Sequence, residues 1–407
     1  MSLVELSEHG EREVALTPEQ AAALHNAAGS RLTVGQGGAA GSFTIKASSY
    51  IGTIVVDDLA VRIRPKVPIA NVLHLLGHAS TPAAWLTGAE AGYDTAPDAT
   101  AAFAELYGRT LTSTLARGPL HGYREHHDEL VALRGRVDLA AQMRRPGQQT
   151  PVACRYVDFT PDIDANRYVK HATRILLRTP GVATSSRRTL KRGLLQLEDV
   201  QDVVPRIDLA SRIVHTRLTR HYQPLLELSE LVLRSVTLSD EAGGVAASTF
   251  LLDMNAIFER FLEAALRNEL AGRLRVSGQD PTHLDVDRRV RMLPDLVFRD
   301  RRDRVVLVAD AKYKLTDDGV GRTSDYYQLL AYCTRYGLRE GLLLYATVDG
   351  DTPPTTMTVE HAGIRLHTMA VDLTGDPARI AGEVRRIATA IEVLGASATQ
   401  VPTAEPS

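Results

Sequence analysis

Three ionisable residues stand where two consecutive predicted strands meet. The apolar run Val305–Val308 is typical of a central strand, yet it leads into Asp310 and Lys312. Alternate residues of a strand share one face, so these two side chains project together, roughly 6–7 Å apart along the strand. Asp295 follows Pro294, which is tolerated at a strand start. A tight hairpin would bring Asp295 beside Asp310, and we expect two carboxylates and an amine to converge there.

Adjacent carboxylates repel each other unless a cation lies between them. Mg²⁺ prefers oxygen ligands and keeps several waters, so Asp295, Asp310 and the main-chain carbonyl of Ala311 would suit it, with Mn²⁺ as a possible substitute. Such an ion neutralises a phosphate and lowers the pKa of a bound water, while Lys312 would position or deprotonate that water. These are the requirements of phosphodiester hydrolysis. The competing interpretation is a surface hairpin with an Asp–Lys ion pair.

Three further residues are candidates for the same site. Gln328 and Tyr332 are four residues apart in a predicted helix and therefore share a face. This pair resembles the Q-x-x-x-Y element of RecB-like nucleases, although Gln328 could be a surface residue and Tyr332 a core aromatic. Glu259 lies on the helix before the strands. RecB-like and related nucleases often bring a glutamate from the corresponding helix to the metal. Glu263 and ordinary salt bridging compete with that role.

The elements that must position these residues follow a compact order. Residues 253–273 form a strongly amphipathic pattern, and three strand candidates follow at 287–292, 294–300 and 304–314. A helix over 324–337 and a buried strand over 341–348 complete an αβββαβ order. This order predicts a mixed sheet flanked by helices.

The whole chain divides into four predicted segments. Residues 1–130 form a β-rich N-terminal domain, 131–245 a mostly helical middle region, 246–394 the domain with the candidate site, and 395–407 a disordered tail. Within 1–130, a helical pattern runs from about Ile69 to Arg117, and Pro224 in the middle region marks a kink or restart of a helix. The predicted class is α/β, or α+β over the whole chain.

Composition excludes several classes of protein. The chain has 407 residues, 44% hydrophobic and 24% charged, with a formal net charge of −2. No segment approaches the roughly 20 apolar residues of a membrane helix, and the N-terminus does not resemble a signal peptide. Cys154 and Cys333 are expected to be reduced thiols. We therefore expect a cytoplasmic protein with no membrane partner. Basic runs at 185–193, 206–220 and 287–292 could contact phosphate or simply be solvated.

Other cofactor sites have no support in the sequence. The histidines show no zinc-binding spacing, and two cysteines cannot hold an iron–sulfur cluster. The segment 35–42, GQGGAAGS, lacks the lysine and hydroxyl of a P-loop and the βαβ context of a dinucleotide site. We interpret it as a flexible hairpin tip.

Together these segments resemble the McrC family, the nuclease subunit of McrBC modified-cytosine restriction systems. The resemblance rests on seven stretches of the sequence: SYIGTIVVDDLAVRIRPKV, LRGRVDLAAQMR, YVDFTPDIDANRYVKHAT, LLDMNAIFERFL, MLPDLVF, ADAKYK and YYQLLAY. It implies a PD-(D/E)XK endonuclease domain that cleaves DNA in a type IV, modification-dependent defence system. It also implies a partner, a McrB-like AAA+ GTPase or ATPase that forms a hexameric ring.

On this resemblance, residues 1 to about 130 would dock in the ring and stimulate nucleotide turnover. The 35–42 tip could be the inserted element. Arg62, Arg64 and Lys66 are candidates to reach a nucleotide, although an exposed strand face explains them as well. Two alternatives stay open: an adaptor that activates the ring without cleaving DNA, and a stand-alone RecB-like repair nuclease.

Overall fold

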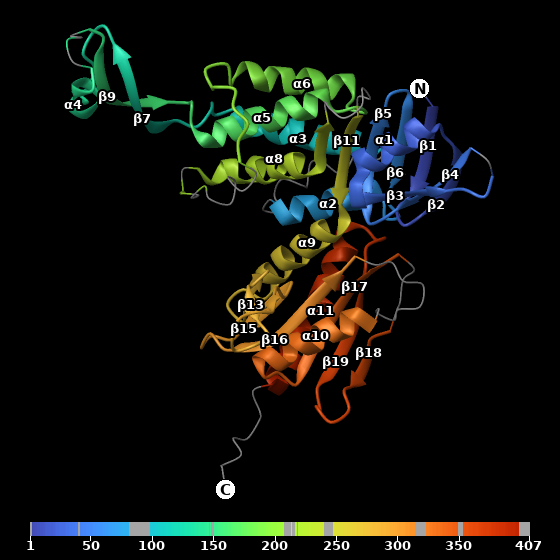
Figure 1. The fold of residues 1–407 in the computed structure, drawn as a ribbon. Coiled ribbons are helices and arrows are strands. Elements are labelled where there is room, and N and C mark those ends of the chain that lie inside the picture. Colours follow the sequence, from blue (N-terminus) through green and yellow to red (C-terminus); the bar gives the residue numbers. More distant parts are fainter. Residues whose placement is uncertain are drawn as a thin grey trace. The chain divides into compact units, whose positions relative to one another are not determined.

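The computed structural model describes residues 2–39, 41–80, 98–145, 147, 150–206, 213, 216–217, 219–239, 247–313, 323–348 and 353–398 (Figure 1). The chain forms two compact units. The first combines residues 1–102 with 238–407, and the second contains residues 103–237. The mixed α/β class expected from the sequence is confirmed. Within the described residues, no helix is both long enough and apolar enough to cross a membrane.

The N-terminal part of the first unit contains two sheets. A five-stranded sheet has the order β1 (Ser2–Ser7), β6 (Leu59–Arg64), β5 (Tyr50–Val56), β11 (Ala247–Asp253) and β10 (Val236–Ser239). A three-stranded sheet has the order β2 (Glu11–Ala15), β4 (Ser42–Ala47) and β3 (Leu32–Gln36). Their buried side chains, among them Ile45 and Ile54, form one hydrophobic core with Leu24 of the helix at 18–28. Helix α2 (Ile69–Ser80) follows β6 and packs against helix α9.

Helix α1 (Pro18–Ala28) lies within the region that the sequence predicted to be β-rich. Its start is a capping box: the Gln20 amide donates to the Thr17 hydroxyl at 3.2 Å, and the Thr17 amide donates to the Gln20 side chain at 3.1 Å. Pro18 occupies the first helical turn, where its missing N–H costs nothing. Alanines and Leu24 then give the helix a buried face.

The C-terminal part of the first unit is built on a six-stranded mixed sheet. Its order is β12 (Arg275–Gly278), β15 (Leu296–Arg299), β16 (Val305–Lys312), β17 (Glu340–Thr347), β19 (Arg365–Asp372) and β18 (Thr355–Thr358). The three central strands are parallel, and the outer pairs are antiparallel. Helix α10 (Thr323–Tyr336) packs on one face through the core around Val308 and Leu343. Helices α9 (Met254–Glu269) and α11 (Pro377–Ala398) pack against each other and β16.

The second unit contains the helices that the sequence predicted for the middle region. These are α5 (Asp164–Arg178), α6 (Thr184–Leu195), the 3₁₀ turn η4 (Arg220–Tyr222) and α8 (Gln223–Ser235). The unit also contains the end of α3 (Ala99–Leu115), which lies in the helical pattern predicted within 1–130. The Tyr107 hydroxyl is buried between Thr173 at 2.9 Å and Ser229 at 3.0 Å. Pro224 is the second residue of α8, so the predicted helix restart is confirmed.

A three-stranded sheet also belongs to the second unit. It has the order β7 (Gly122–Leu130), β9 (Val152–Thr160) and β8 (Arg136–Val137), and the short helix α4 (Leu139–Met143) follows β8. We call residues 122–160 the β7–β9 arm. Because β7 pairs with β9 along its whole length, the predicted boundary at residue 130 divides a single sheet.

The boundary predicted at 246 is also displaced. Strand β11 pairs antiparallel with β5, so residues 247–253 complete the N-terminal sheet. Asp253, the last residue of β11, then caps α9 by accepting from the Asn255 amide at 3.0 Å. Local sequence patterns could not reveal this, because the pairing partner of β11 is about 200 residues away.

The disordered tail was predicted to begin at Gly395, but helix α11 includes this residue. Helix α11 continues through residues 395–398, where small helix-compatible residues extend it and Gly395 is buried. Residues 399–407 lie outside the described residues. The segments 81–97 and 240–246 also lie outside them. Cys154 and Cys333 are both buried free thiols, as expected.

Gly52 on β5 is a position where only glycine fits. Its φ is +135°, and a Cβ atom there would lie 2.0 Å from the main-chain oxygen of Phe250 on β11. Both the backbone conformation and the close approach of β11 therefore exclude a side chain.

We expect Gly52→Ala to lower the free energy of unfolding of the first unit by about 3 kcal/mol or more, because it adds backbone strain and a clash with β11. Chemical denaturation followed by circular dichroism measures this loss. Gly35→Ala on β3 is the matched control, since a Cβ there meets nothing within 4 Å. Equal stability of the two variants would contradict this account of the β5–β11 pairing.

Candidate active site on the C-terminal sheet

The predicted hairpin between the two site-bearing strands is confirmed. β15 and β16 are antiparallel with Leu296 opposite Ala309, which places Asp295 level with Asp310. The main-chain oxygen of Asp295 accepts from the Gln279 amide at 3.3 Å, just beyond β12. Asp295 is therefore held between two neighbouring strands.

The three ionisable groups converge as the alternation of side chains predicted. The Lys312 ammonium lies 2.7 Å from Asp310 Oδ2 and 3.5 Å from Asp295 Oδ2. The Ala311 amide donates to Asp295 Oδ2 at 3.0 Å. Asp310 is fully buried, while the side chains of Asp295 and Lys312 are 12% and 18% exposed. Such burial does not match the alternative of a solvated surface ion pair.

Burial controls the electrostatics of this cluster. Loss of solvent, together with the neighbouring Asp295 carboxylate, raises the pKa of Asp310 to about 7 despite the nearby Lys312 ammonium. Burial alone would lower the pKa of Lys312, but the Asp310 and Asp295 carboxylates outweigh it and hold that pKa above its usual value. Lys312 therefore remains charged, and Asp310 can exchange a proton for another cation near neutral pH.

Glu259 on α9 belongs to the same electrostatic cluster. Burial and the Asp295 carboxylate, with a smaller contribution from Asp310, raise its pKa to about 8. Glu263, one turn later, is used differently: it accepts from the Gly278 amide at 2.8 Å and pairs with Arg267. Of the two glutamates weighed from the sequence, Glu259 is therefore the one coupled to the site.

The donor set is compatible with a hard divalent cation. Asp310 Oδ1 is buried without a hydrogen-bond partner among the described residues. The N–H and C=O of one strand residue point to the same side, so the Ala311 carbonyl is directed to the side where its amide meets Asp295. Among the described residues no three His, Cys, Asp or Glu side chains are arranged to hold a metal ion. An ion here would depend on Asp295, Asp310, the Ala311 carbonyl and water.

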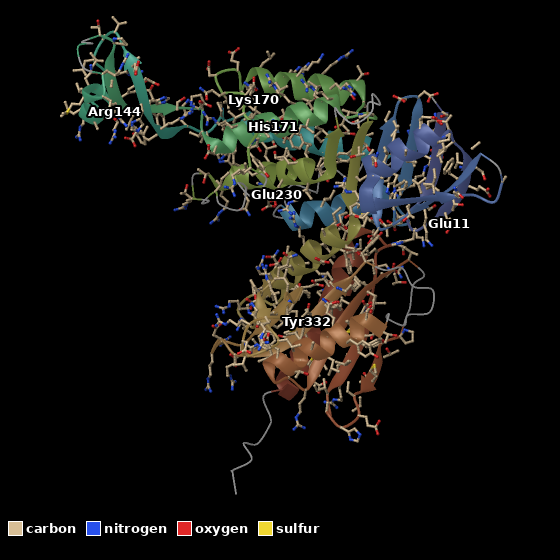
Figure 2. The ribbon with its side chains drawn as sticks, viewed as in Figure 1. Glu11, Arg144, Lys170, His171, Glu230 and Tyr332 are labelled. Carbon is tan, nitrogen blue, oxygen red and sulfur yellow. The ribbon has the colours of Figure 1, made fainter. Side chains whose placement is uncertain are left out.

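Gln328 and Tyr332 on α10 form a chain of hydrogen bonds to the segment before Asp295. The Gln328 amide donates to the Tyr332 hydroxyl at 2.7 Å, and this hydroxyl donates to the Leu293 carbonyl at 3.1 Å. Tyr332, which is labelled in Figure 2, is also a core residue and belongs to the same hydrophobic cluster as Val308. The two interpretations weighed for Tyr332 are thus compatible, because a core aromatic fixes the main chain two residues from Asp295.

One contact at the site was not visible in the sequence. The Tyr313 hydroxyl, next to Lys312, donates to Glu8 Oε1 at 2.9 Å, and both residues are fully buried. The Lys66 amide donates to the same oxygen at 3.2 Å. Burial raises the pKa of Glu8, and the Tyr313 ring lies 6.0 Å from that of Phe258. The end of the site strand is thereby joined to the N-terminal sheet.

The N-terminal candidates have simpler surroundings. Arg62 pairs with Glu5 and Asp98, and Arg64 also pairs with Glu5. The 35–42 segment joins β3 and β4, as predicted for a hairpin. Its described residues are not loosely held, because Glu13 accepts from the Gly38 amide at 2.8 Å and from the Ala39 amide at 3.3 Å. The main-chain amides that could bind a phosphate at this tip are thus already bound to the Glu13 carboxylate.

Comparison with known proteins places the chain in a family. The model of the McrBC 5-methylcytosine restriction system component matches residues 45–346. The chain therefore belongs to this family. No protein of curated function matches it.

Two solved structures that match this chain come from Thermococcus gammatolerans. One belongs to a refined half-complex from the tetradecameric assembly of McrB AAA+ hexamers with bound McrC. It is 20% identical, with a TM-score of 0.57, over 96% of this chain and 100% of that chain. A chain of the cryo-EM structure of the McrBC complex is 23% identical, with a TM-score of 0.45, over 66% of this chain and 88% of that one.

We expect Mg²⁺ or Mn²⁺ to bind more weakly as the pH falls below 7, because protons compete for Asp310. A folded-state pKa of about 7 means that the carboxyl is mostly protonated at pH 6 and ionised at pH 8. The affinity should fall about 10-fold between these values. Titration of the full-length protein with Mn²⁺, followed by electron paramagnetic resonance, measures it, with Asp310→Asn as the control that removes the ligand. An affinity independent of pH would contradict metal binding at Asp310.

Proposed function

We propose that this chain is the Mg²⁺-dependent DNA endonuclease subunit of a McrBC-like, type IV restriction complex. The observation that carries the proposal is the buried pair Asp295 and Asp310 with Lys312 between them, at 3.5 Å and 2.7 Å. Family membership supports the restriction context. The strand order around the site, with α9 before it and α10 after it, supports a PD-(D/E)XK nuclease domain over about residues 254–398.

The chemistry follows from the positions of the side chains. Asp295, Asp310 and the Ala311 carbonyl would hold the cation, which supplies charge neutralisation at the scissile phosphate and a more acidic water. Lys312 stays protonated beside both carboxylates, so its role is to orient the attacking water and offset charge on the pentacovalent phosphorus. Glu259, with its pKa raised to about 8, is mostly protonated at neutral pH and would release that proton when the cation binds beside it. Tyr332 and Gln328 fix the main chain before Asp295.

We expect Asp310→Ala and Lys312→Ala each to reduce Mg²⁺-dependent DNA cleavage by about 1,000-fold or more, since each removes a charge used in the transition state. Cleavage of modified plasmid DNA by the complex with its ring partner is the assay. Arg302→Ala, an exposed arginine on the turn between β15 and β16, is the control and should cleave normally. If both site variants assemble with the ring and cleave at the wild-type rate, the chain is better described as an adaptor.

The partner that we propose is a McrB-like AAA+ ring. The solved complex of similar fold contains McrB AAA+ hexamers with bound McrC. Within this chain, the β7–β9 arm exposes an unusual set of large apolar side chains. They are Tyr123, Val131, Leu133, Val137, Leu139, Met143, Val157 and Phe159. Exposed apolar surface of this kind marks a site of protein contact. We therefore assign docking to the arm rather than to the 35–42 tip, whose residues are small and polar.

We expect the double substitution Tyr123→Ser and Phe159→Ser to weaken assembly with the ring by about 10-fold or more and to reduce stimulation of its nucleotide hydrolysis. The two rings contact each other at 5.1 Å between centroids and are 82% and 62% exposed, so the change should not disturb folding. Val204→Ser removes an equally exposed apolar residue outside the arm and serves as the control. Unchanged assembly and hydrolysis would refute docking through the arm.

A further inference from the structure

A short hairpin precedes Asp295 in the chain. Strands β13 (Thr282–His283) and β14 (Arg291–Met292) pair, and the Leu284 amide donates to the Val290 carbonyl at 2.9 Å. Asp285 closes the tip by accepting from the main-chain amides of Arg289 and Val290, at 2.9 Å and 2.8 Å. The hairpin is thus ordered by its own backbone and does not need a ligand to form.

The charges on this hairpin are unequally paired. Asp285 and Asp287 both form ion pairs with Arg289. Among the described residues, no ion pair involves Arg288, Arg291 or, on the adjacent helix α10, Arg335. All three are exposed. The hairpin and the end of α10 therefore present arginines that no described carboxylate neutralises.

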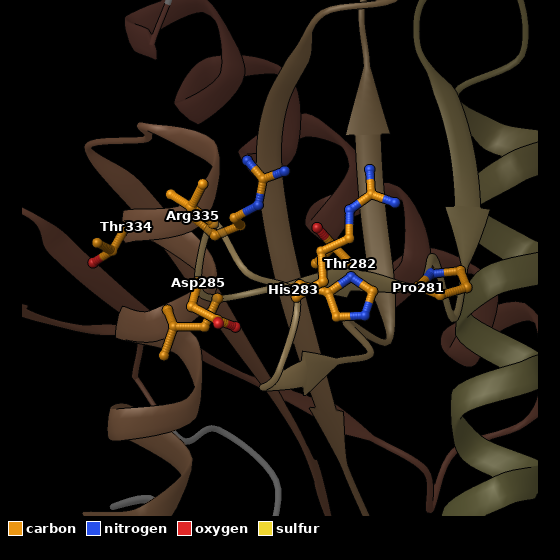
Figure 3. Close-up of a pocket in the computed structure, with 9 residues that line it drawn as sticks. Pro281, Thr282, His283, Asp285, Thr334 and Arg335 are labelled. Atoms are coloured by element: carbon orange, nitrogen blue, oxygen red, sulfur yellow. The ribbon is translucent and has the colours of Figure 1, made fainter.

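Two of these arginines, Arg288 and Arg335, border a cavity of about 660 Å³ between the hairpin and the end of α10. Its lining includes Arg288, Arg335, His283, Thr282 and Thr334, with Asp285 at the hairpin tip. Figure 3 shows Arg335 of α10 beside the hairpin residues Thr282 and His283. Guanidinium groups with hydroxyl donors are the groups that commonly bind phosphate oxygens.

Both elements that line the cavity, the hairpin and α10, also carry residues near the candidate active site. Met292, at the end of β14, packs in the same core as Tyr332 and Val308, and Asp295 follows three residues later. Arg335 is three residues after Tyr332 on α10, about one helical turn. The hairpin and α10 thus each carry both residues that line the cavity and residues that pack near Asp295.

We propose that this cavity binds the sugar–phosphate backbone of DNA on one side of the cleaved bond, with Arg288 and Arg335 on successive phosphates. Arg291 adds charge at the base of the hairpin. Val286, 99% exposed, and Leu284 present apolar surface at the tip, which suits contact with sugars or base edges in a groove. The inference rests on the proposed nuclease function and names the surface by which that site holds its substrate.

Direct binding of DNA tests this assignment separately from cleavage. The full-length protein carrying Asp310→Ala, which prevents cleavage, is titrated with a fluorescent 30-base-pair duplex in Mg²⁺, and anisotropy is followed at several salt concentrations. Adding Arg288→Ala and Arg335→Ala should weaken binding by about 10-fold and reduce the slope of log affinity against log salt by about 1.8, which corresponds to two lost phosphate contacts. Arg288→Lys with Arg335→Lys, which keeps both positive charges, should retain most of this slope.

The control removes the same charge elsewhere in the domain. Arg302→Ala with Arg385→Ala changes two exposed arginines, on the turn between β15 and β16 and on helix α11, neither of which lines the cavity. An equal loss in this control would show a nonspecific charge effect and overturn the proposal. Unchanged DNA binding by the Arg288→Ala, Arg335→Ala variant would also overturn the proposal. This holds even if that variant no longer assembles with the ring.

The two proposals fail in different ways. If Arg288→Ala with Arg335→Ala, on the otherwise native chain, binds and cleaves DNA as wild type does, the cavity assignment fails and the nuclease assignment stands. If Asp310→Ala cleaves normally while the arginine variant loses DNA binding, the catalytic assignment fails and the cavity remains a DNA-binding surface.

Discussion

The structure of the candidate site depends on one electrostatic constraint: two aspartates share a nearly dry space with a single ammonium. Asp310 is fully buried and faces Asp295, so the cluster of Asp295, Asp310 and Lys312 carries a net negative charge when both carboxyls are ionised. In surroundings of low dielectric constant this excess must be balanced by a proton or by a further cation. Glu259 on α9 strengthens the requirement by adding a third acidic group. The site is therefore built to exchange protons for positive charge.

The surrounding elements keep this unfavourable arrangement in place. The antiparallel pairing of β15 with β16 sets Asp295 level with Asp310, and the Ala311 amide holds the Asp295 carboxylate. Tyr332 fixes the preceding main chain through Leu293, with a ring that is itself part of the core. Because these contacts are main-chain hydrogen bonds and close packing, they resist relaxation that would separate the carboxylates.

Much of the site could be predicted from local patterns. Alternation on β16 placed Asp310 and Lys312 together, the proline before Asp295 indicated a strand start, and helical spacing aligned Gln328 with Tyr332. Helix α1 could also have been found, since Thr17 and Gln20 form a capping box. The domain boundaries and the Glu8–Tyr313 contact depend on residues about 200 to 300 positions apart, which no local pattern encodes. The metal, the DNA and the catalytic roles remain predictions.

The path of the chain through the N-terminal sheet has a consequence for biosynthesis. Strand β5 has β6 on one side and β11 on the other, and β11 is synthesised only after the whole second unit. As the polypeptide leaves the ribosome, one edge of β5 stays without its partner while residues 103–237 emerge and can fold first. An apolar strand with an open edge is prone to pairing with other chains. The N-terminal half of this protein is therefore most vulnerable to aggregation during its own translation, and truncation before residue 253 would make that exposure permanent.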